Sequence, residues 1–237
     1  MKVMKRILLY CLIMFTGISI HAQDKNWGVG IGTYQSKDLL LTPRRYLGVG
    51  INFQKNYETN TERFLKLITL SSVIGVQKDR LSYYGLMIGS HYSYNLLYKL
   101  KNETLSVGLK FAKSYNNHYF FGIDDGHLYW LASMNLQPSV RYKSEMKNGR
   151  NFIVNCSFVL AGVNSRPNYP NYMSNFKLIH LFTNQFKNLS FVSVADYLSP
   201  TVDLLYFTPN KRKFGIQFQY QQYQEIQMLS YGLNYIF

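Results

Sequence analysis

The sequence has little cysteine and no long apolar run after its first residues. Among its 237 residues only Cys11 and Cys156 are cysteines, and Cys11 lies in an N-terminal segment that we expect to be removed. A single remaining cysteine excludes an intramolecular disulfide, so the fold must be stable through its own hydrogen bonds and its surroundings. The absence of a second long apolar run excludes a membrane-spanning helix in the rest of the chain.

Acidic residues are also scarce. The chain has 12 Asp and Glu against 26 Lys and Arg, which gives a formal net charge of +14. The basic residues are dispersed over expected turns and form no run, so we interpret them mainly as solvated charges. No nucleic-acid-binding motif is present, and we expect no nucleic-acid partner. A small anionic solute or an anionic lipid is compatible with the positive balance.

The first 22 residues have the three parts of a secretory signal peptide. Lys2, Lys5 and Arg6 form a basic start, a short apolar core follows, and "IHA" supplies small residues for cleavage near Ala22. The apolar core is too short to span a bilayer comfortably. We therefore expect a signal peptide at residues 1–22 and one exported domain at 23–237.

Strand-length alternation recurs along the exported part. In "FGIQFQYQQ", aromatic or aliphatic residues alternate with glycine and glutamine, and this period of two is that of a strand with two different faces. A soluble sandwich would bury the apolar face, whereas a transmembrane barrel turns it toward lipid and the polar face toward the lumen. For a barrel, the large side chains predicted to face the lumen are Lys110, Arg141, Gln217, Gln219 and Gln221.

Turn lengths test whether neighbouring strands agree on their outward face. A two-residue turn at Lys101-Asn102 brings two apolar faces together. A three-residue loop ending at Gly149, with this glycine in the left-handed conformation, places Val140 opposite Cys156 on the outward face. A two-residue turn at Gln224-Glu225 does the same for the last two strands. The meander is therefore consistent from hairpin to hairpin.

The chain ends on "SYGLNYIF", where Tyr231, Leu233, Tyr235 and Phe237 share one face of a strand. This ending resembles the C-terminal signal that the insertion machinery reads in bacterial outer-membrane β-barrels. The "HAQ" signal end and the composition rich in Tyr, Asn and Lys look like outer-membrane proteins of Bacteroidota. The resemblance implies a barrel in the cell outer membrane, with outer-membrane lipid, lipopolysaccharide and the barrel-assembly machinery as partners.

We therefore predict an all-β fold, a transmembrane antiparallel up-and-down β-barrel of about ten strands, or twelve if residues 176–194 add a pair. An even number keeps both termini on one side. A barrel of about ten strands leaves a narrow interior. We expect a non-enzymatic integral barrel without a cofactor, acting as a narrow channel or as a binding or structural component of the envelope. A soluble secreted β-sandwich is the further alternative.

An enzymatic alternative depends on "GSHYSYN". His91 and Ser93 are similar to the H-x-S pair of the outer-membrane phospholipase A and lipid A deacylase barrels, and the histidine could act as base for the serine. Those enzymes present the pair to lipid, whereas strand parity here places it in the lumen. Tyr94 also stands where the family pattern has Asn. The expected neighbours across the hairpin are Lys110, opposite Ser93, and Ala112, and neither is an acid.

A metal-binding alternative depends on "FGIDDGHLYW". Asp124, Asp125 and His127 could together hold a divalent cation on an outer loop. Their spacing fits no known loop motif, and Asp-Asp-Gly is an ordinary turn sequence. We therefore expect a turn here and no resident metal.

Overall fold

All the elements that the computed structural model describes are β-strands. The signal peptide, Asp124, Asp125 and most of residues 176–194 lie outside the described residues, as does the His127 side chain. No helix of the described part is long and apolar enough to cross a membrane. The structure describes residues 24–38, 42–78, 84–100, 104–121, 127–146, 149–166, 186–209, 213–224 and 226–237.

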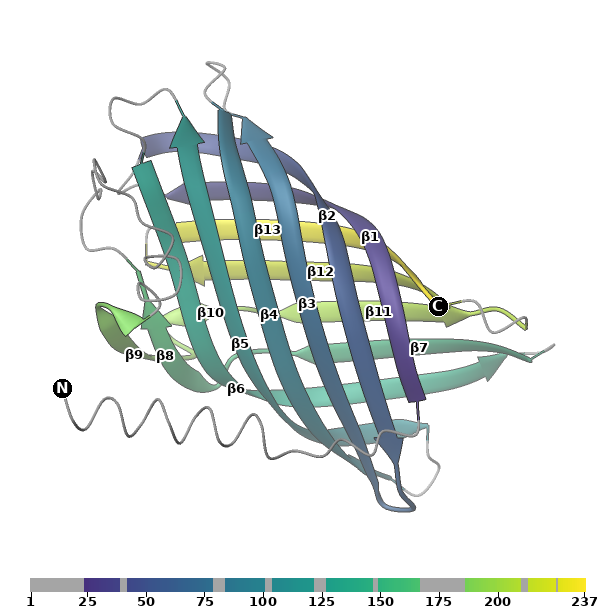
Figure 1. Ribbon diagram of the computed structural model, residues 1–237. Coiled ribbons are helices and arrows are strands. Elements are labelled where there is room, and N and C mark those ends of the chain that lie inside the picture. The colour runs from purple at the N-terminus through teal and green to yellow at the C-terminus, as the bar shows by residue number, and fades with distance from the viewer. Residues whose placement is uncertain are drawn as a thin grey trace, which may run out of the picture.

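Ten of the strands close into an antiparallel barrel, as predicted (Figure 1). Each of these ten strands pairs with the barrel strand before it and the barrel strand after it, with β7 pairing to β11, and the last strand pairs with the first, so the barrel has no free edge. The barrel strands are β1 (Asp24–Asp38), β2 (Thr42–Asn60), β3 (Phe64–Lys78), β4 (Tyr84–Lys99), β5 (Leu105–Phe121), β6 (His127–Met146), β7 (Arg150–Ser157), β11 (Thr201–Phe207), β12 (Lys213–Tyr223) and β13 (Ile226–Ile236).

Three short strands extend this barrel beyond the ends of β7 and β11: β8 (Ala161–Ser165), β9 (Leu189–Ser193) and β10 (Tyr197–Leu198). β8 continues β7 along β6 after a bulge, at which the Leu160 nitrogen donates to the Leu136 oxygen at 2.9 Å while Ala161 pairs with the same residue. Pro138 lies beside this bulge on β6 and has no N–H to donate. β9 then pairs with β8, and β10 pairs with β12.

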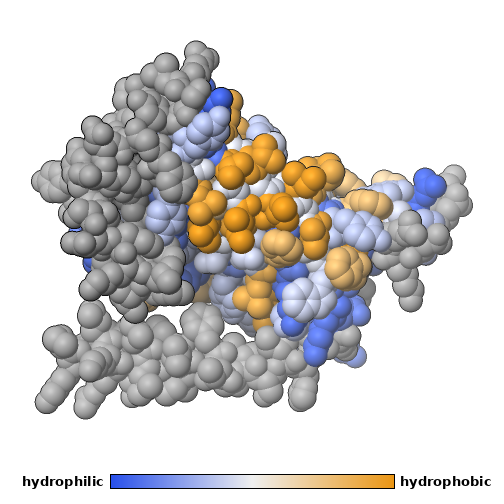
Figure 2. All heavy atoms as spheres, turned by 45° about the horizontal axis from the view of Figure 1, so that its top comes forward, coloured by the Kyte–Doolittle hydropathy of each residue, from blue (hydrophilic) through white to orange (hydrophobic). Residues whose placement is uncertain are grey.

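The two faces of the sheet differ sharply in polarity. On the outer face Ile31, Ile51 and Ile74 lie side by side on β1, β2 and β3 and are 65%, 51% and 54% exposed. Figure 2 shows apolar side chains gathered over the middle of the molecule, with hydrophilic side chains on both sides of them. The inner face carries buried polar residues such as Asn95 and Gln137. Because one closed sheet has its apolar face outward, the soluble-sandwich alternative is wrong.

The register around the barrel sets its width. Starting at Gly28 on β1, successive paired positions on β2, β3, β4 and β5 lead to Ser133 on β6. In the other direction, successive paired positions on β13, β12, β11 and β7 lead to Glu145 on the same strand. The displacement from 133 to 145 is a shear of 12 residues. With ten strands this shear gives a tilt of about 40° and a backbone radius of roughly 10 Å. Side chains from opposite walls therefore reach each other.

Two of the three predicted hairpin registers are confirmed. Val140 pairs with Cys156, and Gly149 has a φ of 71° in the left-handed region. At the last hairpin Phe214 pairs with Tyr235. The turn residue Gln224 has a φ of 51°. These turns are short enough for their residue types to fix the pairing.

The register predicted for the hairpin between β4 and β5 is wrong by two residues. Lys110 pairs with Asn95, and Ser93 pairs with Ala112. The connection is longer than two residues, since β4 ends at Lys99 and β5 begins at Leu105. An even shift preserves the face on which every side chain lies, so the assignment of the lumen is unaffected.

The C-terminus completes the closure of the barrel. The Phe237 nitrogen donates to the Trp27 oxygen at 2.7 Å, and the Trp27 nitrogen donates to the Phe237 oxygen at 2.9 Å. Tyr231, Leu233, Tyr235 and Phe237 are all exposed on the outer face, and the Phe214 and Tyr235 rings are in contact at 5.4 Å between centroids. Recognition of this strand by an assembly machinery stays a prediction.

Candidate functional site in the barrel lumen

A network around Lys110 fills one side of the lumen. Lys110 on β5 and Arg141 on β6 point inward and are only 8% and 7% exposed. The Lys110 Nζ donates to Ser157 Oγ at 3.3 Å, and this hydroxyl donates to Gln137 Oε1 at 3.0 Å. Asp203 on β11 lies close enough for its charge to act on Lys110. Asp203 therefore supplies an opposite charge that favours the buried ammonium.

An ion pair crosses the lumen on the side of this network that is nearer the chain termini. Arg141 on β6 and Glu58 on β2 approach to 3.5 Å between guanidinium nitrogen and carboxylate oxygen. The two strands are four positions apart in a ring of ten, so they lie on nearly opposite walls. Since the pair bridges these walls, it obstructs passage along the axis.

Two amide side chains separate the remaining space into two cavities. The cavity away from the chain termini, which we call the distal cavity, measures about 110 Å³, and the cavity beside the termini, the terminal cavity, about 130 Å³. Gln54 and Gln217 line both. Gln54 has room because Gly28 faces it: a Cβ on this glycine would come within 2.8 Å of the Gln54 side chain.

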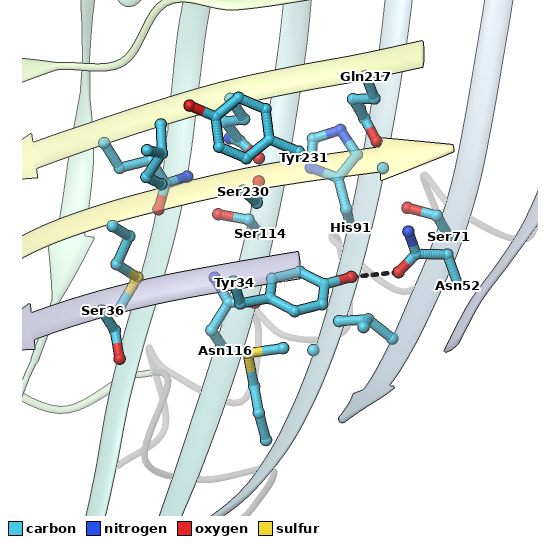
Figure 3. Close-up of a pocket in the computed structure, with 18 of the residues that line it drawn as sticks. Tyr34, Ser36, Asn52, Ser71, His91, Ser114, Asn116, Gln217, Ser230 and Tyr231 are labelled. Atoms are coloured by element: carbon cyan, nitrogen blue, oxygen red, sulfur yellow. Dashed lines mark hydrogen bonds between the residues drawn. The ribbon is translucent and has the colours of Figure 1, made fainter. Parts of the chain in front are cut away.

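Uncharged polar groups dominate the distal cavity (Figure 3). The Tyr34 hydroxyl donates a hydrogen bond to Asn52 Oδ1, and His91 and Ser71 face the same space. No Lys, Arg, Asp or Glu is among its described lining residues. Hydroxyl, amide and imidazole groups can donate and accept hydrogen bonds without requiring a charged ligand. The polar lining includes Tyr34, Ser36, Asn52, Ser71, His91, Ser114, Asn116, Gln219, Gln221 and Ser230.

An apolar cluster occupies the inner face near the distal end of the barrel. Tyr197 on β10 is fully buried and meets Tyr223 on β12 with ring centroids 6.0 Å apart. The cluster brings the β9–β10 segment against the barrel strands, which narrows the distal entrance. Its members are Tyr46, Leu131, Val159, Val192, Tyr197, Tyr223 and Ile226.

The five residues predicted to face the lumen belong to the network, the ion pair and the cavity linings described above. Lys110 belongs to the network, Arg141 to the ion pair, and Gln217 to the boundary between the cavities. Gln219 and Gln221 line the distal cavity. Sequence reasoning missed the partners of the two charged residues, Glu58 and Asp203, as well as Tyr34, Asn52 and Gln54. Strand parity on β2 is the signal that could have found Asn52, Gln54 and Glu58, because all three share the inward face with Gly50.

His91 and Ser93 both point into the lumen. His91 lies in register between Ser71 and Ser114 and lines the distal cavity, whereas Ser93 is buried. The positions paired with them carry no carboxylate that could orient the imidazole. This orientation does not present the pair to lipid, as the resemblance to lipid hydrolases would require.

The other site predictions receive no support from placed side chains. Asp124, Asp125 and the side chain of His127 lie outside the described part of the chain. Within the described part, no three His, Cys, Asp or Glu residues are grouped so as to hold a metal ion. Cys156 is exposed on the outer face, as its parity predicted.

No model of a protein family matches this sequence, and no curated protein matches it. Among solved structures, the chain is similar to the β domain of the Bordetella autotransporter BrkA, with 8% identity over 90% of this chain and 98% of that one and a TM-score of 0.46. The translocator domain of NalP from Neisseria meningitidis has 9% identity, coverage of 100% and 95%, and a TM-score of 0.41. Ail of Yersinia pestis has 10% identity, coverage of 90% and 97%, and a TM-score of 0.35. Similarity this distant carries no function across.

Proposed function

We propose that the protein is an integral outer-membrane β-barrel with a closed lumen, which binds small solutes and does not act as an open diffusion channel. The observation that carries the proposal is the obstruction of the lumen by the ion pair between Arg141 and Glu58. Gln54 and Gln217 also separate the distal cavity from the terminal cavity within the lumen. A barrel of ten strands is also far narrower than the 16–18-stranded water-filled porins.

Placement in a membrane is supported by the outer face. Isoleucine, leucine and aromatic side chains are exposed there in a band, while polar groups fill the interior, which is the pattern of a barrel surrounded by lipid. A closed sheet also satisfies its backbone hydrogen bonds without water. Trp27, Tyr98, Tyr142 and Tyr235 are exposed near the end of the band beside the termini, where aromatic side chains favour the membrane interface.

The chemistry of the two cavities suggests different ligands. The distal cavity offers hydroxyl and amide groups and favours a small uncharged solute that forms hydrogen bonds. The terminal cavity is lined by Arg141 and Lys213 together with Glu58 and Asp203. We assign the small anionic solute that the net charge suggested to the terminal cavity. The ion selectivity of a variant with an opened lumen tests this assignment.

Current recorded across a planar bilayer tests whether the lumen is closed. The purified wild-type protein is expected to insert without discrete current steps. The quadruple variant Gln54→Ala/Glu58→Ala/Arg141→Ala/Gln217→Ala removes both the ion pair that obstructs the lumen and the boundary between the cavities, and it is expected to produce small, discrete steps. Measuring reversal potentials under a salt gradient then shows whether anions or cations pass.

Gln219→Ala is the matched control, because Gln219 lines only the distal cavity. It should remain as silent as the wild type. Protease protection, measured on lipid vesicles that contain each variant, establishes that the variant has inserted into a bilayer. Regular current steps from the wild-type protein would contradict the proposal of a closed lumen.

A further inference from the structure

Three basic side chains gather on the outer face of adjacent strands. Lys37 on β1 pairs directly with Arg45 on β2, and Lys78 on β3 pairs with Leu47, two residues from Arg45. Their parity is that of the exposed residues Ile31, Leu47 and Val76. No ion pair joins any of the three to a carboxylate that the structure describes. We call these three residues the cationic cluster.

The cationic cluster lies at the edge of the apolar band that is remote from the chain termini. Lys37 follows Trp27 by ten residues on β1, which corresponds to about 25 Å along the axis of a barrel with strands tilted by about 40°. This is the height of the apolar band of a membrane barrel. The Lys78 Nζ also lies 5.2 Å from the centroid of the Tyr84 ring, as expected for side chains at the lipid headgroups.

An outward-facing groove lies directly beside the cationic cluster. Its volume is about 460 Å³, and it runs over the outer surface of β13, β1, β2 and β3 as far as Tyr84. Lys78 lines its rim. The rest of its outward lining is mainly aliphatic and aromatic, and includes Leu47, Val49, Val76, Leu229 and Tyr231.

We propose that the groove and the cationic cluster together bind one phosphate-bearing membrane lipid. The headgroup phosphate contacts Lys37, Arg45 and Lys78, and an acyl chain lies in the groove. Three neighbouring cations that form no ion pair with a described carboxylate complement an anionic headgroup, and the arginine can bind phosphate through two parallel hydrogen bonds. The apolar lining complements a hydrocarbon chain. The proposal rests on the membrane placement proposed above.

Native mass spectrometry of the detergent-purified protein tests this site. With dioleoyl phosphatidic acid and dioleoyl phosphatidylcholine offered in equal amounts, the wild type is expected to retain phosphatidic acid preferentially. The triple variant Lys37→Gln/Arg45→Gln/Lys78→Gln should lose this preference, with about a fivefold weakening for each cation removed. Val49→Trp, which fills the groove from an exposed position, should reduce retention of phosphatidic acid with the cations intact.

Lys55→Gln/Lys66→Gln is the matched control, because both lysines lie on the outer face of β2 and β3 nearer the termini. It should retain phosphatidic acid as the wild type does. An equal loss in the control, or unchanged retention in the triple variant, overturns the site. Displacement of the lipid by millimolar inorganic phosphate would also overturn it, since the site would then bind the free ion. Insertion into vesicles, measured on the same samples, separates these outcomes from failure of the membrane placement.

Discussion

Replacing Ile51 by arginine is expected to lower the free energy of unfolding by about 2–4 kcal/mol, the cost of a basic side chain at the midplane of a bilayer. Ile51 lies halfway along the outward face of β2, six residues from Arg45 and six from Tyr57. Its outward neighbours on the adjacent strands are Ile31 and Ile74. A guanidinium at this position would be surrounded by hydrocarbon on every side.

Leu47→Arg provides the matched comparison on the same strand and face. Leu47 is even more exposed than Ile51 but lies near the edge of the band, so arginine there should cost only about 0–1 kcal/mol. Guanidinium unfolding in phosphatidylcholine vesicles, followed by tryptophan fluorescence, measures both values. Equal costs at the two positions would contradict a bilayer around the band, because exposed positions on a water-soluble protein tolerate arginine alike.

Lys110→Met is expected to destabilise the protein by about 3–5 kcal/mol, the penalty for leaving a buried charge without its partner. The substitution preserves most of the side-chain volume but leaves Asp203 in the lumen without a balancing charge. It also removes the hydrogen bond to Ser157. The loss should appear in the same guanidinium titration as a lower midpoint with an unchanged slope.

The double variant Lys110→Met/Asp203→Asn distinguishes the lost charge balance from lost packing. It removes both charges and keeps an amide beside Gln217, so it should recover most of the stability lost by Lys110→Met. A double variant as unstable as the single one would show that Asp203 does not balance Lys110. The loss would then come from the contacts of Lys110 alone.

The barrel could be predicted from the sequence because its strongest signals are local. Alternation with a period of two identifies the strands and separates their faces. The turn residues Gly149 and Gln224 set the registers of two hairpins correctly. The register of the hairpin between β4 and β5 was predicted wrongly because neither Lys101 nor Asn102 dictates a turn length. The bulge at Leu160 depends on its position beside Pro138 of a neighbouring strand, which sequence reasoning did not anticipate.

The lumenal site was only half predictable for a related reason. Parity placed Lys110 and Arg141 inside the barrel, but their partners come from strands that are distant in the chain. Glu58 meets Arg141 across the lumen only because the shear and the strand number set their heights together. Separation of the lumen into two cavities likewise depends on Gln54 and Gln217, which lie more than 160 positions apart in the sequence.

Oxygen accessibility of nitroxide spin labels along β2 tests most directly the claim that the apolar face lies in lipid. Labels are attached at consecutive cysteines replacing Ile51, Asn52, Phe53 and Gln54, in a Cys156→Ala background, and the protein is placed in liposomes. If the apolar face lies in lipid, labels at 51 and 53 have high oxygen and low nickel-complex accessibility, and labels at 52 and 54 have low oxygen accessibility. Accessibility without this alternation, or strong nickel access at 51 and 53, would contradict this claim.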